Sequence, residues 1–191
     1  MSPKNALIAI NREEFRQWLA ENHDTATECW LRVKRGRPTD DGTFCYLDSV
    51  EEALCFGWID GHLKAFEGLG TLQRFTPRKK KSQWTELNKE RVRRLETLGL
   101  MTDSGRAVLP PMGPRSFRID ADVGRALKDA RVWAKFKRFP PLYQRIRAYN
   151  VAFLKGRPNG TYEKSLANLI EHTRRGEMYG EWNDYGRLLD Y

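Results

Sequence analysis

The chain has 191 residues, of which 40% are hydrophobic and 31% charged, and its net charge at neutral pH is +9. No run of 18 apolar residues occurs, and the short apolar patch at residues 6–10 is too short for a signal-peptide core. We therefore expect a cytoplasmic globular protein without a membrane span, made of one large or two small domains. Its basic balance favours anionic partners over cationic ones.

Cysteine and histidine usage gives no indication of a metal or disulfide framework. The three cysteines (Cys29, Cys45 and Cys55) are odd in number and form no C-x-x-C pair, so we expect three buried thiols. The three histidines lack the paired spacing of metal ligands. No P-loop, dinucleotide-binding or nucleophile-elbow motif occurs either. These patterns predict neither a metal nor a cofactor.

The first half of the chain mixes strand and helix signals. Residues 6–10 predict a short strand, and Asn11 with Glu14 forms a capping box for a helix that runs to about residue 22. Alternation over residues 29–35 predicts a half-buried strand, which a polar turn follows. Asp48 is the predicted N-cap of a second helix that ends at Gly57.

A hairpin and a third helix complete this half. Residues 58–66 and 71–76 predict two strands, and Pro77 stops the second. Ser82 is the predicted N-cap of a helix that carries Trp84 on its buried stripe and ends at Gly99. The sequence thus predicts an α+β fold with a small antiparallel sheet over residues 1–109.

The second half reads as purely helical. A Pro-rich segment at residues 110–117 predicts a linker, and residues 118–177 show helical periodicity throughout. The tail at residues 178–191 is rich in aromatic side chains. Such a tail packs either on its own chain or on a neighbouring copy, which would make a homo-oligomer.

Positive charge concentrates at residues 72–95, which hold nine Lys and Arg against two Glu. A cationic run directly before a helix N-terminus favours binding of an anion, and nearby Trp side chains offer stacking surfaces. We therefore predict a basic and aromatic ligand site. Its candidate residues are Trp58, Lys64, Arg74, Arg78, Lys79, Lys80, Lys81, Ser82, Trp84 and Asn88.

Several interpretations of this region stay open. The run is either an anion site, for a phosphate ligand or a polyanion, or a solvated basic loop. In a nucleic-acid-binding protein, Trp58 or Trp84 would stack on bases, whereas in the alternative both belong to the core. An enzyme would use Asp60 and His62 as an acid–base pair, because period two places them on one strand face with Lys64.

Four segments also resemble a known family. They are SVEEALCFGWIDG (residues 49–61), QRFTPR (73–78), SQWTELN (82–88) and GLMT (99–102). Their order and spacing are similar to those of the YdeI/OmpD-associated family, also called bacteriocin-protection proteins, over residues 10–176. The resemblance implies a small bacterial α+β protein linked by its name to bacteriocin or stress protection. It implies no established reaction or catalytic residues.

Overall fold

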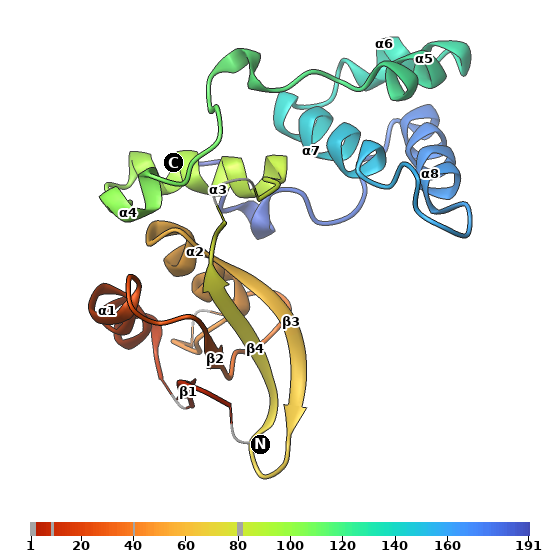
Figure 1. The fold of residues 1–191 in the computed structure, drawn as a ribbon. Helices are drawn as coiled ribbons and strands as arrows, with labels where there is room; N and C mark the ends of the chain where they lie inside the picture. Colours follow the sequence, from red (N-terminus) through yellow and green to blue (C-terminus); the bar gives the residue numbers. More distant parts are fainter. Residues whose placement is uncertain (1–2, 9, 40, 80–81) are drawn as a thin grey trace. The chain divides into compact units, whose positions relative to one another are not determined.

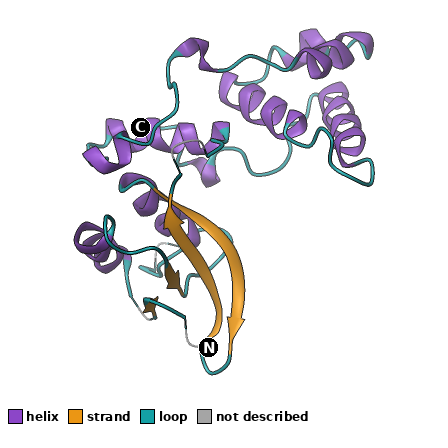
Figure 2. Ribbon diagram, in the orientation of Figure 1, coloured by secondary structure: helices purple, strands orange, loops and turns teal. Residues whose placement is uncertain are grey.

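The computed structural model describes residues 3–191 except residues 9, 40 and 80–81. Its described part contains four strands, eight α-helices and two short 3-10 helices, which confirms the predicted α+β class (Figures 1 and 2). The chain divides into two compact units, which are described separately. Unit 1 comprises Met1–Gln83, Arg91–Pro110 and Tyr191, and unit 2 comprises Trp84–Glu90 and Pro111–Asp190.

Unit 1 contains a four-stranded sheet in the order β1-β2-β4-β3. Strand β1 (Ala6–Leu7) runs parallel to β2 (Cys29–Leu31), and β2 is antiparallel to β4 (Gly70–Pro77). The hairpin partner of β4 is β3 (Trp58–Phe66), as the sequence predicted. The sheet is therefore antiparallel except at β1. The strand predicted at residues 29–35 is shorter than expected and ends at Leu31.

Helix α1 (Arg12–Asn22) begins as predicted. The Asn11 Oδ1 accepts from the Glu14 amide at 2.9 Å, and the Glu14 carboxylate accepts from the Asn11 amide at 2.8 Å. Helix α2 (Tyr46–Cys55) begins three residues earlier than predicted, so Asp48 is not its N-cap. Asp48 occupies the third helical position, where its carboxylate accepts from the backbone amide of Cys45. The sequence identified the capping carboxylate but assigned it the wrong position.

Helix α3 (Glu86–Thr97) also departs from the prediction. It starts four residues after Ser82, so Ser82 is not its N-cap, and Trp84 precedes the helix. The amide of Asn88 instead donates to the Thr85 hydroxyl at 3.1 Å. The predicted anion site at a helix N-terminus beside Ser82 therefore does not form.

The core of unit 1 lies between the sheet and helices α1 and α2. Phe15 of α1 packs on Phe75 of β4 with ring centroids 5.7 Å apart. Trp58 is 1% exposed, stands edge-on to Trp18, and donates its indole N–H to the carbonyl of His23 at 3.0 Å. This confirms the core interpretation of Trp58. The three cysteines are free and buried, as expected.

A bulge in β3 separates residues that the sequence placed together. Asp60 pairs with Phe75, and the register then shifts before Leu63. Opposite residues of antiparallel strands share a face, and a bulge shifts the alternation by one residue. Asp60 therefore lies on the helix-covered face. His62 lies on the other face, where its ring contacts Trp30, which pairs with the β4 residue next to Phe75. The predicted shared face is wrong for Asp60, whereas His62 and Lys64 do lie on one face.

A close backbone approach joins α2 to α4 (Asp103–Arg106). Thr102, the N-cap of α4, donates its hydroxyl to the carbonyl of Cys55 at 2.6 Å. A Cβ added at Gly105 would lie 2.2 Å from that same carbonyl oxygen, so a side chain at Gly105 has no room. Gly57 ends α2 with a φ of +75°, as the sequence predicted.

Unit 2 is helical, and no strand occurs after Pro77 among the described residues. Its helices share one hydrophobic core with the aromatic tail. Trp182 of the tail is 8% exposed and stands edge-on to Tyr143, with ring centroids 5.5 Å apart. The tail thus packs within its own chain. The elements of unit 2 after α3 are η1 (Pro114–Ser116), α5 (Ala121–Asp129), α6 (Trp133–Phe136), α7 (Pro141–Ala152), α8 (Thr161–Arg175) and η2 (Asp184–Gly186).

No helix within the described ranges combines the length and apolar character that a bilayer crossing needs.

Candidate functional site

The predicted ligand residues do not form one site. Lys64 and Arg74 lie on the sheet face opposite Asp60: Lys64 lies over the ring of Phe66, and Arg74 pairs with Glu28. Of the other members, Arg78, Lys79 and Ser82 follow β4 in unit 1, and the rest do not join them. Trp58 belongs to the core, Trp84 and Asn88 are buried residues of unit 2, and Lys80 and Lys81 lie outside the described residues.

Three predicted residues do meet in unit 1. Arg78 follows β4, is only 7% exposed, and lies close enough to Asp60 for their charges to interact. Its Nη1 donates to the Ser82 hydroxyl and to the Gln83 carbonyl, each at 3.4 Å. Burial lowers the pKa of Arg78 to about 10, and the attraction of Asp60 only partly offsets this. The buried guanidinium of Arg78 thus lies beside the hydroxyl of Ser82, in the loop that follows β4.

Tyr46 and Arg35 extend this group, which we call the Arg78 cluster (Arg35, Tyr46, Asp60, Arg78 and Ser82). The Tyr46 hydroxyl donates to Asp60 at 2.6 Å, and the Arg35 guanidinium lies 4.2 Å from the Tyr46 ring centroid. Burial and the Asp60 carboxylate raise the pKa of Tyr46 well above its ordinary value. Tyr46 therefore remains a protonated donor that holds Asp60 in place.

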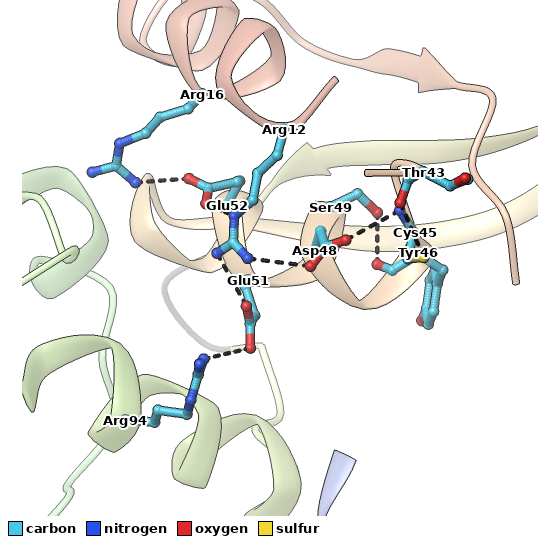
Figure 3. A network of polar contacts seen from close by, with 10 residues as sticks. All are labelled: Arg12, Arg16, Thr43, Cys45, Tyr46, Asp48, Ser49, Glu51, Glu52 and Arg94. Atoms are coloured by element: carbon cyan, nitrogen blue, oxygen red, sulfur yellow. Dashed lines mark hydrogen bonds and ion pairs between the residues drawn. The ribbon is translucent and has the colours of Figure 1, made fainter. Parts of the chain in front are cut away.

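A second polar group surrounds helix α2 (Figure 3). We call it the α2 ion network (Arg12, Arg16, Asp48, Glu51, Glu52 and Arg94). Arg12 contacts all three carboxylates: Asp48 at 3.2 Å, Glu51 at 3.0 Å and Glu52 at 2.6 Å. Burial opposes the charge of Arg12, but these carboxylates outweigh it and raise the Arg12 pKa.

The other two arginines of the α2 ion network bind the same carboxylates from different elements. Arg16 of α1 contacts Glu52 at 2.7 Å, and Arg94 of α3 contacts Glu51 at 2.8 Å. A cavity of about 260 Å³ beside them is lined by Arg12, Arg16, Arg94, Glu13, Glu52 and Leu100. Because carboxylates of α2 already engage the guanidinium groups lining this cavity, we interpret the network as a structural cross-link.

Sequence reasoning missed Tyr46, Arg35 and the buried acids of α2. Glu51 is fully buried and Glu52 is 2% exposed, although such residues rarely leave water unless they are paired. One signal was available: Arg12 and Arg16 lie four residues apart and therefore share one face of α1. Their carboxylate partners are 36 or more positions away, so no local pattern reveals the pairing.

The Arg78 cluster and the α2 ion network both lie mainly within one family match. The sequence profile of a domain of unknown function (DUF8412) matches residues 7–108, just over half of the chain. The chain belongs to the DUF8412 family. The DUF8412 match covers the sheet except Ala6, helices α1 to α4 and every predicted ligand residue. Comparison with curated proteins and with solved structures gave no match.

The DUF8412 match corrects the family resemblance. The four segments that suggested the YdeI/OmpD-associated family all lie within residues 7–108, and the profile that matches there is that of DUF8412. Short motifs of apolar and turn residues, such as ALCFGWIDG, reflect the helix–turn–strand step from α2 to β3 as much as common descent. The link to bacteriocin protection rested on that resemblance alone and is therefore withdrawn.

Proposed function

We propose that the DUF8412 domain of this chain binds a small oxyanion, such as phosphate, at the Arg78 cluster. The observation that carries the proposal is the buried guanidinium of Arg78, which donates to the Ser82 hydroxyl in the loop after β4. Arginine presents several N–H donors in a rigid fork that matches the oxygens of phosphate. The exposed side chain of Lys79 adds a further positive charge next to it in the chain.

Electrostatics support an anion at this position. Burial disfavours the charged form of Arg78 and lowers its pKa to about 10. An oxyanion beside the guanidinium would favour the charged form and raise that pKa again, so binding and charge recovery reinforce each other. The phenol of Tyr46 holds the Asp60 carboxylate by a hydrogen bond of 2.6 Å.

The other interpretations of the sequence receive less support. Trp58 and Trp84 are 1% and 7% exposed, so neither offers an open ring face to a base. Asp60 and His62 lie on opposite faces of the sheet, so they do not act on one substrate as an acid–base pair. Among the described residues, no group of three or more His, Cys, Asp or Glu side chains is arranged to hold a metal ion.

Phosphate titration of the full-length protein tests the proposal. A ligand that binds the folded state raises the unfolding free energy by about 2.7 kcal/mol at one hundred times its Kd, so the melting temperature should rise with phosphate. We expect Ser82→Ala and Arg78→Lys to reduce this rise, the first by removing a hydroxyl and the second by removing the fork. Arg78→Lys keeps a positive charge, so a loss of phosphate binding in this variant would show that the planar arrangement of the guanidinium donors is required.

Lys64→Gln is the matched control, because Lys64 is exposed and lies on the opposite face of the sheet. It should leave the phosphate response unchanged. The proposal fails if phosphate does not stabilise the wild type. It also fails if Lys64→Gln loses as much of the response as Arg78→Lys, since that result indicates nonspecific attraction to net charge.

A further inference from the structure

A long segment of unit 2 is rich in basic side chains. Residues 115–157 hold twelve Lys and Arg against three Asp and no Glu. Two of these acids, Asp120 and Asp122, are engaged by Lys155, at 2.5 and 2.7 Å. Asp120 also caps helix α5 by accepting from backbone amides. The surface of α5 to α7 therefore has a large excess of positive charge, which attracts polyanions.

Trp133, at the start of α6, lies among these cations. Its ring is half-buried, and its inner side packs against Phe136 of the unit 2 core. The ammonium groups of Lys128 and Lys137 lie 5.4 and 5.8 Å from its ring. Neither lysine contacts a carboxylate within the part of the chain that the structure describes, and both are exposed. Lys137 also donates to the side-chain oxygen of Gln144 at 2.7 Å. An aromatic ring and two exposed ammonium groups thus occur together.

A cavity lies against the same ring. It measures about 350 Å³ and is lined by Trp133, Lys128 and Arg125 together with Ile119, Asp120, Ala121 and Gly124. This volume falls within the range of about 300–1,000 Å³ that is typical of small-ligand sites. A second hollow of about 230 Å³ shares Ile119 and adds Lys137, whereas Arg145, which also lines it, is paired with Glu90 at 2.6 Å. Two adjoining hollows with cations along both suit an extended ligand.

We propose that unit 2 binds single-stranded nucleic acid, with one base stacked on Trp133 and neighbouring phosphates held by Lys128 and Lys137. Stacking on an aromatic side chain beside a basic groove is how proteins bind single strands without strict sequence preference. A cation–π contact at an exposed site is weaker than base stacking. The two ammonium groups can therefore leave the ring for the phosphates when a base arrives.

This site differs from the proposed oxyanion site in residues and ligand. It lies outside residues 7–108, which the DUF8412 profile covers. It also provides a partly exposed aromatic ring, which a nucleic-acid interaction needs and which the buried Trp58 and Trp84 lack. The α2 ion network offers no such surface, because carboxylates already engage its arginines.

Fluorescence anisotropy with a labelled oligothymidylate and the full-length protein tests the inference. We expect binding at low ionic strength that weakens as salt is added. Trp133→Leu should weaken binding at least about fivefold, because stacking is lost while an apolar side chain remains. Trp133→Phe should retain part of the affinity. Circular dichroism melting of each variant shows whether the fold persists.

The lysines have a separate readout. Each phosphate contact to a single strand contributes about 0.7 to the slope of log affinity against log salt, so Lys128→Gln with Lys137→Gln should lower the slope by about 1.4. The matched control is Lys64→Gln with Lys164→Gln, which removes the same charge from exposed positions elsewhere. This control should change the slope much less.

Three results with the protein variants and oligothymidylate would overturn the inference. They are no binding of the oligonucleotide by the wild type at low salt, unchanged affinity in a folded Trp133→Leu variant, and equal slopes in the two double variants. An abasic oligonucleotide separates base stacking from phosphate attraction, and it should bind more weakly than oligothymidylate. Equal affinity for both strands would also contradict stacking on Trp133. Thymidine monophosphate should bind more weakly than the strand, because it reaches only one hollow.

Discussion

Helix α2 of unit 1 and helices α5 to α8 of unit 2 differ in where they place their charged side chains. Unit 1 buries Glu51 and Glu52 on a central helix and neutralises them with arginines from two other helices. Helices α5 to α8 of unit 2 instead pack an apolar and aromatic core and leave most of their charges exposed. Buried charge therefore specifies how the helices of unit 1 meet, whereas exposed charge in unit 2 is available to a partner.

This difference separates structural from functional cations. The guanidinium groups around α2 are engaged by carboxylates at 2.6 to 3.2 Å, so a ligand would have to displace an existing partner. The ammonium groups near Trp133 rest on an aromatic ring and on an amide oxygen, contacts that a phosphate replaces easily. Local density of positive charge alone does not distinguish these two situations.

The largest expected effect comes from breaking the α2 ion network. Glu51→Gln removes a buried carboxylate that holds both Arg12 and Arg94. Loss of one partner of a buried ion pair costs about 3–5 kcal/mol, and urea unfolding should show a decrease of that size. Glu96→Gln is the control, because Glu96 pairs with Arg106 at the surface and should cost only about 0–1 kcal/mol. Equal effects would contradict the structural role of the network.

Two tryptophans test the cores of the two units. Trp58→Ala in unit 1 and Trp182→Ala in unit 2 each truncate a buried ring and should each cost about 3–5 kcal/mol. Hydrogen exchange should localise the loss of protection to the unit that carries the substitution. Tyr185→Ala, at a tail residue that is 41% exposed, should have a much smaller effect. A tail that packed only on a neighbouring molecule would make Trp182→Ala sensitive to protein concentration.

A smaller effect is expected at the contact between α2 and α4. Gly105→Ala places a methyl group 2.2 Å from the Cys55 carbonyl, so the two helices must move apart. Overpacking of this kind costs about 1–3 kcal/mol, which a shift of the urea midpoint should show. Gly113→Ala is the control, since its added Cβ meets no atom within 4 Å and its φ is ordinary. Similar midpoints for both variants would contradict the close packing.

The smallest effect concerns Asp120 in unit 2. Burial opposes its ionisation, but Lys155 and two backbone amides outweigh this and lower the pKa of Asp120. A folded-state pKa below the unfolded value of about 3.9 adds stability above that value, and this stability is lost as pH falls through the folded pKa. Asp120→Asn should remove about 0–1 kcal/mol at neutral pH and nothing at low pH. Thermal melting from neutral to low pH should show the melting temperatures of wild type and Asp120→Asn approach each other. A difference that stays constant with pH would contradict the prediction.

Local sequence signals determined most of the secondary structure. The capping box at Asn11, the stop at Gly57 and the hairpin of β3 and β4 all follow from residues a few positions apart. The helical second half and the buried state of Trp58 also agree with the sequence prediction. Each depends on short-range hydrogen bonding or on hydrophobic periodicity, which a single sequence displays directly.

Tertiary structure alone decided which polar residues meet. The bulge after Asp60 shifts the alternation of β3 by one residue and places His62 on the other face. The period-two pattern of the sequence does not predict this bulge. The pairing of Arg12 with Glu52 joins residues forty positions apart. The high density of positive charge at residues 72–95 led the sequence analysis to predict a single ligand site there. At the Trp133 ring, Lys137 lies four residues further along the chain at helical spacing, whereas Lys128 belongs to α5 and reaches the ring through the turn between α5 and α6.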